Sequence, residues 1–495
     1  MVADWKTFEE WAGSLHDLME VQQLLEWDQQ VAMPRKGGPQ RALQQAALAR
    51  VVHERLTDRR WVDLLGELEG RAATEEQAAD LREARRMTDR ALKLPASLVA
   101  ERAEAVSLAQ AAWEEAKPRA DFASFLPHLE KVLDLTRQTA RCLSPDHPYD
   151  ALLEDFEPGM TEKELERVFA DLKGRLRPFL DRLLGAPHPP DPSVLERVYP
   201  VEAQEALCRE LAREMGYDFE AGRLDRSAHP FTNGTFRDVR ITTRYNERRL
   251  STALFGTLHE AGHALYEQGL DPARYRMPAG QACSLGIHES QSRFWENMVG
   301  RSRPFWTRYF PLLKETFPGT LDDVSPEAFY RAINVVQPSL IRVEADEVTY
   351  GLHIILRFEL EGALLAGTLE AADLPQAWNE KFAAFFGITP PSDREGVLQD
   401  VHWSAGLIGY FPTYALGNLY AAQFREAMRK DIPDMDARIA AGDLRPMKRW
   451  LNEKVHRLGR LYLPGELCAR VTGKPLSAEP ATAYLTQKFG EVYNI

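Results

Sequence analysis

The sequence has few cysteines, and none of them lies near another. The four are Cys142, Cys208, Cys283 and Cys468, and they form no Cys-x-x-Cys pair. This spacing excludes a disulfide framework and a zinc site built from thiolates. It is typical of a protein from a reducing compartment, so we expect a cytoplasmic location.

The chain also lacks an excess of basic residues. Its 61 Lys and Arg residues are outnumbered by 74 Asp and Glu residues, which gives a formal net charge of −13. Proteins that bind nucleic acid normally carry a basic surface, and anionic membranes attract basic segments. We therefore expect neither nucleic acid nor a membrane as a main partner.

Long apolar runs are almost absent as well. The first ten residues carry acidic side chains where a signal peptide would carry basic ones. One uncharged stretch, residues 401–424, is long enough to cross a bilayer, but it contains histidine, proline, asparagine and several glycines. We interpret this stretch as a buried core helix that carries polar site residues.

Helical patterns dominate the rest of the chain. Residues 37–70 repeat apolar side chains with a helical period, and residues 74–117 are rich in Ala, Glu, Arg and Leu, which favour helices. Proline-rich stretches at 143–150 and 185–192 interrupt this pattern, and the second is interpreted as a hinge or long loop. Residues 233–245 differ, because an Asn-Gly turn precedes an alternating pattern that predicts a short strand. The fold class is therefore mainly α with a small β-sheet.

The most specific motif is His-Glu-Ala-Gly-His at residues 259–263. Two histidines four positions apart lie on one face of a helix, so both imidazoles can bind one ion. The apolar neighbours of the motif favour burial, where unpaired histidines would be costly. We therefore predict that His259 and His263 bind a metal ion and that Glu260 moves a proton of a reacting water. The alternative is a solvent-facing helix with a chance pair of histidines.

A catalytic zinc ion needs a third protein ligand and an open position. The next candidate segment is Gly-Ile-His-Glu-Ser-Gln-Ser-Arg at 286–293, which opens a helix that continues to about Gly300. Glu289 lies 30 residues after the first motif histidine, which leaves room for a second helix to return alongside the first. Glu289 is the favoured ligand and His288 competes with it. The alternative role of His288 is a core residue, or a residue that contacts a ligand from outside.

These two motifs together resemble the M32 metallocarboxypeptidases, the carboxypeptidase Taq family. The matches run from about residue 24 to residue 419 of the 495 residues, so the resemblance covers nearly the whole chain. Other matching stretches lie at residues 25–28, 33–34, 225–231, 238–240, 341–347, 399–403 and 409–414.

The resemblance implies a helical fold like that of neurolysin and angiotensin-converting enzyme. In such a fold two helical halves flank a deep cleft, so residues 1–495 would form a single peptidase domain. It also implies a homodimer and one zinc ion, or a cobalt ion, per chain, held by His259, His263 and Glu289. Many related zinc enzymes have an Asp four residues after the third ligand to orient a histidine, but here that residue is Arg293. The acceptor must therefore come from elsewhere in the chain.

The resulting hypothesis is a carboxypeptidase that removes amino acids one at a time from peptide C-termini with broad specificity. Glu260 is expected to accept a proton from water and deliver it to the departing amine. The tetrahedral oxyanion needs further hydrogen-bond donors. His402 and Tyr410, both in the uncharged stretch, are the candidates, and the alternative is that both are ordinary core residues.

A carboxypeptidase must also bind the free carboxylate of its peptide substrate. The resemblance points to Arg342, whose planar guanidinium can bind both oxygens, with Tyr414 as a helper. The alternative for Arg342 is an ion pair with a nearby acid. His229, directly before a Pro-Phe pair, is a candidate substrate contact or a loop-stabilising residue. The predicted strand is expected to pair with the peptide backbone.

Two other classes of function remain open at this point. A zinc endopeptidase or oligopeptidase would share the metal core but would have a cleft open at both ends, and it would cut peptides whose C-terminus is amidated. A helical binding scaffold would carry an inert motif and would hold no stoichiometric metal.

Overall fold

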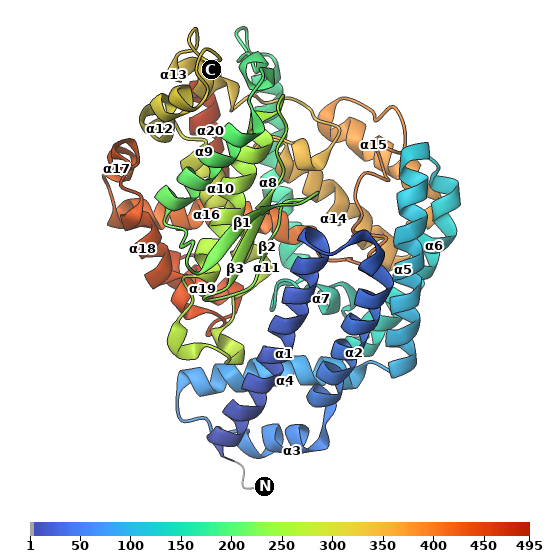
Figure 1. Cartoon of the computed structure of the whole chain (residues 1–495). Helices are drawn as coiled ribbons and strands as arrows, with labels where there is room; N and C mark the ends of the chain where they lie inside the picture. The colour runs from blue at the N-terminus through green and yellow to red at the C-terminus, as the bar shows by residue number, and fades with distance from the viewer. Residues whose placement is uncertain (1–3) are drawn as a thin grey trace. The chain divides into compact units, whose positions relative to one another are not determined.

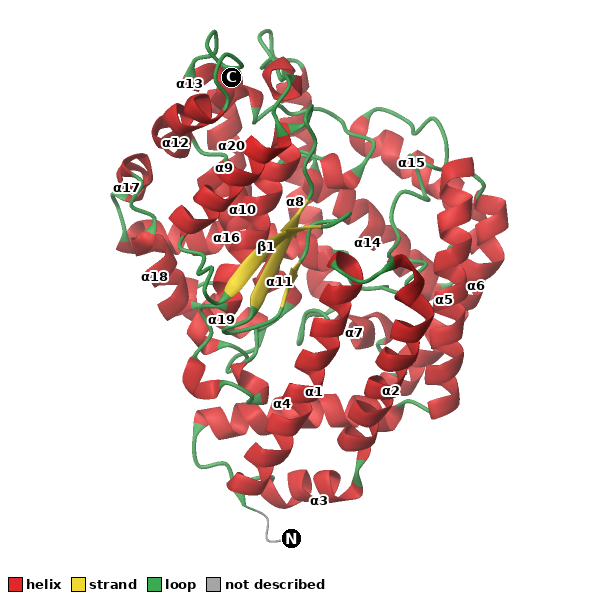
Figure 2. Ribbon diagram, in the orientation of Figure 1, coloured by secondary structure: helices red, strands yellow, loops and turns green. Residues whose placement is uncertain are grey.

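The structure is a computed structural model that describes residues 4–495. It is helical apart from one small sheet (Figure 2), which confirms the predicted mainly α fold class. Every helix among residues 4–495 is too short or too polar to cross a lipid bilayer. The likeness to neurolysin and angiotensin-converting enzyme stays a prediction.

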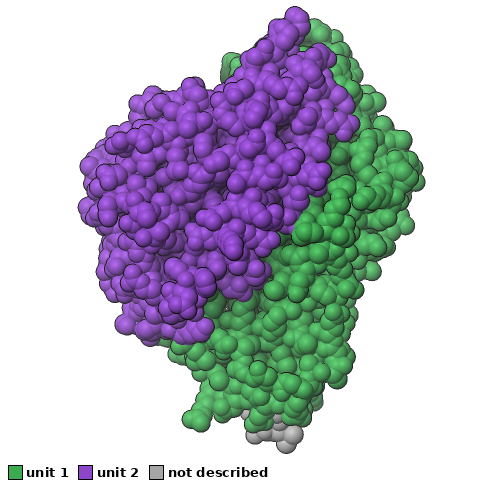
Figure 3. Space-filling view, turned by 180° about the vertical axis from the view of Figure 1, so that it is seen from behind, with its two compact units in different colours: residues 1–92, 190–333, 420–475 green, residues 93–189, 334–419, 476–495 purple. Residues whose placement is uncertain are grey.

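The chain divides into two compact units, coloured separately in Figure 3. Unit 1 contains residues 1–92, 190–333 and 420–475, and unit 2 contains residues 93–189, 334–419 and 476–495. Each unit is thus assembled from three segments that are far apart in the sequence. One boundary falls within the proline-rich stretch that was predicted to be a hinge or loop. A single domain with a cleft between two halves stays a prediction.

Unit 1 carries the sheet and most of the helices (Figure 1). Its elements are α1 (Trp5–Val31), η1 (Arg35–Gly37), α2 (Gly38–Thr57), α3 (Arg59–Leu68), α4 (Glu75–Lys93), η2 (Ser193–Glu196), α9 (Val201–Met215), β1 (Gly222–Arg226), β2 (Thr232–Asn233), β3 (Val239–Thr243), α10 (Leu250–Glu267), η3 (Pro272–Arg274), η4 (Pro278–Gly280), α11 (Leu285–Arg293), the π-helix η5 (Phe294–Gly300), α12 (Arg303–Thr316), α13 (Pro326–Ala332), α17 (Met435–Ala441), α18 (Arg445–Lys454), η8 (His456–Leu458) and α19 (Pro464–Thr472).

Unit 2 consists of helices and connecting loops, without a strand among its described residues. Its elements are α5 (Ala96–Arg119), α6 (Phe122–Leu143), α7 (Pro148–Leu153), α8 (Glu162–Leu184), η6 (Arg342–Glu344), α14 (Tyr350–Ala366), η7 (Ala371–Asp373), α15 (Leu374–Phe386) and α20 (Glu479–Tyr493). One further helix, α16 (Pro412–Asp431), begins in unit 2 and ends in unit 1.

The two long helical regions expected at the start of the chain are each divided in two. Asp58 separates α2 from α3, and its side chain accepts a hydrogen bond from the Arg60 amide (2.8 Å), which caps the second helix. Pro95 separates α4 from α5, because the residue before a proline avoids the helical conformation.

The sheet has the strand order β1-β3-β2, with β1 parallel and β2 antiparallel to β3. The predicted strand is therefore present as β3, and its Val239 and Ile241 side chains are buried. The expectation that this strand pairs with a peptide substrate is wrong, because both of its edges already pair with β1 and β2. The sheet packs against α10 through β2 and β3.

The uncharged stretch at 401–424 is not one core helix, as the sequence had suggested. Residues 401–411 form consecutive turns, and α16 begins only at Pro412. Gly406 and Gly409 have φ angles of +67° and +86°, a region that favours glycine and is incompatible with a continuing α-helix. His402 and Tyr410 therefore lie on a loop, which we call the 401–411 loop.

Each unit contains one helix that is buried on nearly every face. In unit 1 this helix is α10, where Leu254, Leu258 and Leu265 are almost completely buried. In unit 2 it is α14, where Leu352 and Leu356 are fully buried. Both helices also carry buried charged side chains, and these charged groups organise the candidate sites.

Candidate metal centre and substrate site

The metal centre is formed where α11 packs against α10 in unit 1. A Cβ atom at Gly262 would lie 2.7 Å from the Ser292 Cα and 2.8 Å from the Gln291 carbonyl oxygen, so only glycine allows this approach. The Ser284 hydroxyl accepts a hydrogen bond from the Ile287 amide (3.0 Å) and caps α11 at its start. As predicted, the second helix returns beside the first.

This packing brings the three predicted ligands together. The Oε2 atom of Glu289 lies 3.6 Å from the His259 Nε2 and 3.4 Å from the His263 Nε2. One ligand atom from each of the three residues falls within 4.8 Å of the others. Two imidazole nitrogens and one carboxylate oxygen form a donor set typical of catalytic zinc.

The other ring nitrogen of each histidine has its own partner. The Nδ1 atom of His259 lies 2.9 Å from the Glu296 Oε2, and the Nδ1 of His263 lies 2.6 Å from the Nδ1 of His288. The His288 Nε2 lies 2.8 Å from a Glu267 oxygen, which can only accept. His288 therefore donates to Glu267 and accepts from His263, which leaves the Nε2 lone pair of His263 directed at the cluster.

His288 thus lies behind His263, in the outer role that was its alternative to ligation. The acceptor that the sequence did not identify for His259 is Glu296, from the π-helix η5. Glu296 follows Glu289 by seven residues, which places both on one helix face, and this spacing is the signal that could have revealed it.

Arg293, which replaces the expected Asp, bridges the two carboxylates. Its Nε donates to Glu289 (2.6 Å) and its Nη1 to Glu296 (3.3 Å), while Arg301 donates to the other oxygen of Glu296 (3.2 Å). Burial alone would raise the pKa of Glu296, but the hydrogen bond from His259 and the two arginines outweigh burial and lower the pKa to about 2. Glu296 is therefore ionised near neutral pH.

The charges around the cluster fit a divalent cation. Four carboxylates (Glu260, Glu267, Glu289 and Glu296) face two guanidiniums (Arg293 and Arg301), which leaves two formal negative charges. Burial lowers the pKa of His263 to about 3, so its imidazole is in the neutral form that binds metal. Burial alone would raise the pKa of Glu289, but Arg293 and the two histidines together outweigh burial and hold this pKa well below its ordinary range.

Glu260 is buried beside the cluster and is held by a strand. The Thr232 hydroxyl, from β2, lies 2.7 Å from the Glu260 Oε2 and 3.0 Å from the Glu260 carbonyl oxygen. Burial raises the pKa of Glu260, which makes its carboxylate a stronger base. Sequence reasoning missed Thr232, because its contact with α10 depends on how the sheet packs.

His229 lies on the exposed loop that precedes β2. Its carbonyl oxygen accepts a hydrogen bond from the Ser227 hydroxyl (2.6 Å). This backbone contact stabilises the loop, and His229 itself is exposed to solvent. A contact with substrate stays a prediction.

The other predicted substrate and catalytic residues form a second group in unit 2, which consists of Arg342, His402, Tyr410 and Tyr414. Arg342 is buried, and its Nε and Nη2 donate to one oxygen of Asp400 (3.0 and 2.8 Å). Arg357 of α14 donates to the other Asp400 oxygen (2.7 Å). These two charges outweigh burial and hold the pKa of Asp400 far below its ordinary range. The ion pair anticipated as the alternative for Arg342 is thus present, with Asp400 as the acid.

The aromatic candidates surround this arginine. The Arg342 guanidinium lies 4.8 Å from the centre of the Tyr414 ring, and the Tyr414 hydroxyl lies 3.1 Å from the His402 Nε2. The Tyr410 ring is 5.4 Å from each of these two rings. Burial lowers the pKa of His402 to about 4, so its imidazole is neutral near pH 7 and can act as a hydrogen-bond donor.

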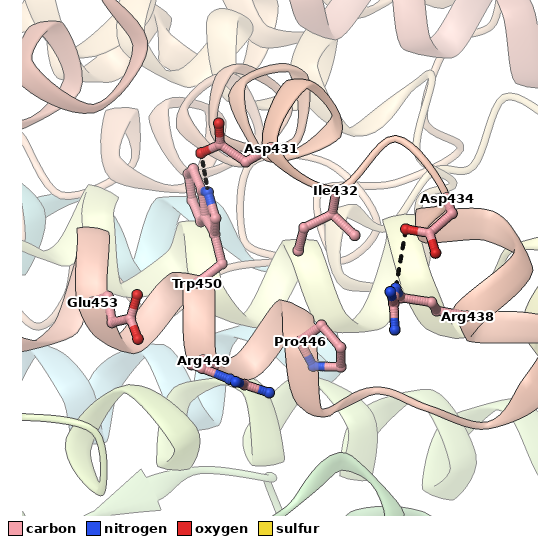
Figure 4. Close-up of a pocket in the computed structure, with 8 residues that line it drawn as sticks. All are labelled: Asp431, Ile432, Asp434, Arg438, Pro446, Arg449, Trp450 and Glu453. Carbon is pink, nitrogen blue, oxygen red and sulfur yellow. Dashed lines mark hydrogen bonds and ion pairs between the residues drawn. The ribbon is translucent and has the colours of Figure 1, made fainter.

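A pocket elsewhere in unit 1 contains none of the predicted site residues. It lies between the end of α16 and the helices α17 and α18, where ion pairs and hydrogen bonds join its lining side chains (Figure 4). Its lining residues are Asp431, Ile432, Asp434, Arg438, Pro446, Arg449, Trp450 and Glu453.

Known proteins resemble this chain over almost its full length. A family model described as carboxypeptidase Taq (M32) metallopeptidase matches residues 7–489. Thermostable carboxypeptidase 1 of Thermus thermophilus is 49% identical over 485 residues, and carboxypeptidase 1 of Bacillus subtilis is 41% identical over 474 residues, in each case over 95% of both chains. The crystal structure of an M32 carboxypeptidase from Deinococcus radiodurans is 43% identical and superposes with a TM-score of 0.97 over 99% of both chains.

Proposed function

Because this chain belongs to the M32 family of metallocarboxypeptidases, we propose that it removes amino acids one at a time from the free C-terminus of peptides, with broad specificity. The observation that carries the proposal is the convergence of His259, His263 and Glu289. The full-length relatives are named carboxypeptidases, so an endopeptidase is not favoured.

The family implies a divalent metal ion, and we assign its ligands to His259, His263 and Glu289. The donor set and the two formal negative charges around it support a zinc ion, or a cobalt ion in its place. A divalent ion bound there supplies a Lewis acid that polarises the scissile carbonyl and acidifies water. The partners behind the histidines hold the ring nitrogens in the tautomer that such an ion requires.

Glu260 accepts the proton of the attacking water and returns it to the departing amine. Two features of its surroundings support this role: burial raises its pKa, and the Thr232 hydroxyl holds one of its two oxygens (2.7 Å). The second oxygen is then oriented for proton transfer, because the side chain cannot rotate without breaking that hydrogen bond.

Arg342 binds the terminal carboxylate of the peptide. The supporting observation is its charge environment: Arg342 and Arg357 share the single carboxylate of Asp400, so the group retains one positive charge. Tyr414 packs on Arg342 and assists it. His402 and Tyr410 donate hydrogen bonds to the oxyanion, and His229 is a substrate contact at the exposed loop.

A peptide ladder followed by mass spectrometry tests this function. Peptides with a free or amidated C-terminus are incubated with the enzyme, with chelator, and with zinc or cobalt restored. We expect stepwise loss from the free C-terminus only, abolished by chelator and by Glu260→Gln. Equal cleavage of amidated peptides would instead show an endopeptidase, and unchanged hydrolysis in Glu260→Gln would show that the motif is inert.

The assembly and location follow from the family resemblance and from the cysteines. We propose a homodimer, which light scattering would measure as twice the chain mass of 56.2 kDa. All four cysteines are free thiols, which supports the cytoplasmic location expected from their spacing. A particle of 56.2 kDa would contradict the dimer.

A further inference from the structure

Glu361 of α14 is a fully buried carboxylate in unit 2 that the reaction scheme does not use. It accepts hydrogen bonds from the Tyr149 hydroxyl (3.0 Å), the Trp403 indole N–H (2.9 Å) and the Gly409 backbone amide (3.1 Å). All three of these donors are neutral groups. Burying a carboxyl group is costly even when it is hydrogen-bonded, so its position calls for a role that explains it.

Two of its three partners belong to the 401–411 loop, and each is next to a candidate catalytic residue. Trp403 directly follows His402, and Gly409 directly precedes Tyr410. One carboxylate therefore holds the loop at two points that are six residues apart, with His402 at one end and Tyr410 at the other. The loop has no regular secondary structure to fix these positions otherwise.

A second residue of α14 holds the chain just before this loop. Arg357, one helical turn before Glu361, donates to Asp400 (2.7 Å) and to the Gln399 side chain (2.8 Å). The middle of the loop is held by Arg102, whose Nη2 donates to the Gly406 carbonyl oxygen (2.9 Å). The loop is thus attached to the buried helix just before its start and at the residue next to each candidate.

We infer that Glu361 is a positioning residue for the hydrolytic reaction, which fixes the 401–411 loop so that the His402 imidazole and the Tyr410 hydroxyl meet the oxyanion. This inference rests on the proposed function of those two side chains. Donors to a developing charge stabilise it only when they are held within about 0.5 Å of the required geometry. The buried carboxylate supplies that constraint for a segment that contains two glycines in the left-handed region.

The decisive variant is Glu361→Gln, which keeps the shape of the side chain. Its amide offers one acceptor oxygen and places an NH2 group against the remaining donors, so the three hydrogen bonds cannot all persist. We expect kcat to fall about 10- to 100-fold, as for other residues that orient catalytic groups. KM should stay within about twofold and the metal content should be unchanged, because Arg342 and the metal ligands keep their partners.

The matched control is Tyr149→Phe, which removes the third donor to the same carboxylate but leaves both loop contacts intact. A purely structural role predicts that both variants lower the melting temperature and leave kcat equally unaffected. A positioning role predicts that only Glu361→Gln lowers kcat. If Glu361→Gln does not fold, Trp403→Phe carries the same comparison, because it removes the indole donor to Glu361 and keeps an aromatic ring at that position.

Tyr410→Phe and His402→Ala, measured in parallel, separate this inference from the proposed function. Low kcat in these two variants with a kcat in Glu361→Gln equal to that of Tyr149→Phe would overturn the inference alone. If Tyr410→Phe and His402→Ala both kept the wild-type kcat, the proposed roles of His402 and Tyr410 would be wrong. The inference about Glu361 would then also be overturned, for any kcat measured in Glu361→Gln. A rise in KM with unchanged kcat in Glu361→Gln would also overturn it.

Discussion

At the scale of single residues, the metal centre depends on the groups behind its histidines. Glu296 contacts His259 directly, whereas Glu267 reaches His263 only through His288. Both arrangements hold an imidazole in one orientation and one tautomer before any ion binds. Because Glu296 contacts a histidine directly and Glu267 only through His288, substitution of each carboxylate should change metal affinity by a different amount.

We expect Glu296→Gln to weaken metal binding about 10- to 100-fold, because the amide cannot replace the anion that orients His259. Competition with a chelator of known affinity measures the change. Glu267→Gln is the matched control and should have a smaller effect, since His288 remains in contact with His263. Equal metal affinity in Glu296→Gln and in the unmodified enzyme would contradict this prediction.

Thr232 provides a second prediction at this scale. Thr232→Val removes the hydroxyl at nearly constant volume and releases the Glu260 carboxylate. A hydrogen bond to a charged group contributes about 1.5–3 kcal/mol, so kcat should fall roughly 10- to 100-fold with unchanged metal content. Thr232→Ser should recover most of the loss. Steady-state kinetics and metal analysis of the three proteins decide the matter, and a wild-type kcat in Thr232→Val would refute it.

The pH dependence of stability follows from Glu361. Burial raises its pKa to about 7, above the value of an unfolded chain, and the opposing charge of Arg357 does not cancel this effect. Between about pH 4.5 and pH 7 the folded state therefore holds a proton that the unfolded chain has lost. The free energy of unfolding then falls as the pH rises through this range, by roughly 3 kcal/mol. Denaturant unfolding of Glu361→Gln should lack this decline relative to the unmodified protein. If the free energy of unfolding depended on pH in the same way in both proteins, this prediction would be contradicted.

At the scale of elements, the approach of α10 and α11 controls the position of the third ligand. Gly262→Ala would place a Cβ 2.7 Å from the Ser292 Cα, so α11 must move and carry Glu289 with it. We expect a loss of about 1–3 kcal/mol in the free energy of unfolding, together with weaker metal binding.

Gly174 of α8 is the matched control for this substitution. A Cβ there has no neighbour within 4 Å, so Gly174→Ala should be neutral or should stabilise the protein by about 0.5–1 kcal/mol. Thermal unfolding with and without added zinc distinguishes the two variants. If Gly262→Ala and Gly174→Ala changed stability and metal affinity by the same amounts, the packing argument would be contradicted.

The elements also show what the sequence could predict. Periodicity and spacing predicted the helices that carry His259 and Glu289, because residues four apart on a helix have a fixed geometry. They failed for residues 401–424, since an uncharged composition does not distinguish a buried loop from a buried helix. The positive φ angles of Gly406 and Gly409 prevent a continuous helix there. The sequence alone does not reveal which backbone conformation a glycine adopts.

At the scale of the whole molecule, the residues that the sequence missed share one property. Thr232, Glu296 and Glu361 all act on a partner from a different element. Each such contact depends on the packing of elements, which the local pattern around Thr232 and Glu361 does not indicate. For Glu296, the seven-residue spacing after Glu289 is the one signal in the sequence. The ligands were predictable because a family motif marks them, whereas these supporting residues were not.

The C-terminal helix α20 provides the last prediction. Lys488 forms a buried ion pair with Glu347, close to Arg342 in sequence. Breaking a buried pair on one side costs about 3–5 kcal/mol, so Lys488→Met should lower stability by that amount and raise KM, with unchanged metal content. The double variant Lys488→Met with Glu347→Gln should recover much of the stability, as calorimetry and kinetics can measure. No recovery in the double variant would contradict this view of the pair.

The sequence separation of these contacts sets an order of events during synthesis on the ribosome. The hydrogen bonds that Thr232, Glu296, His288 and Glu267 contribute around the proposed metal ligands and Glu260 join residues at most 37 positions apart. The Tyr493 hydroxyl, in contrast, contacts the backbone of Val336 across 157 positions. A growing chain therefore completes its metal-binding segment long before the segment with Arg342 receives its last support. We therefore expect the local contacts of the proposed metal ligands to form earlier than the contacts that support the segment with Arg342.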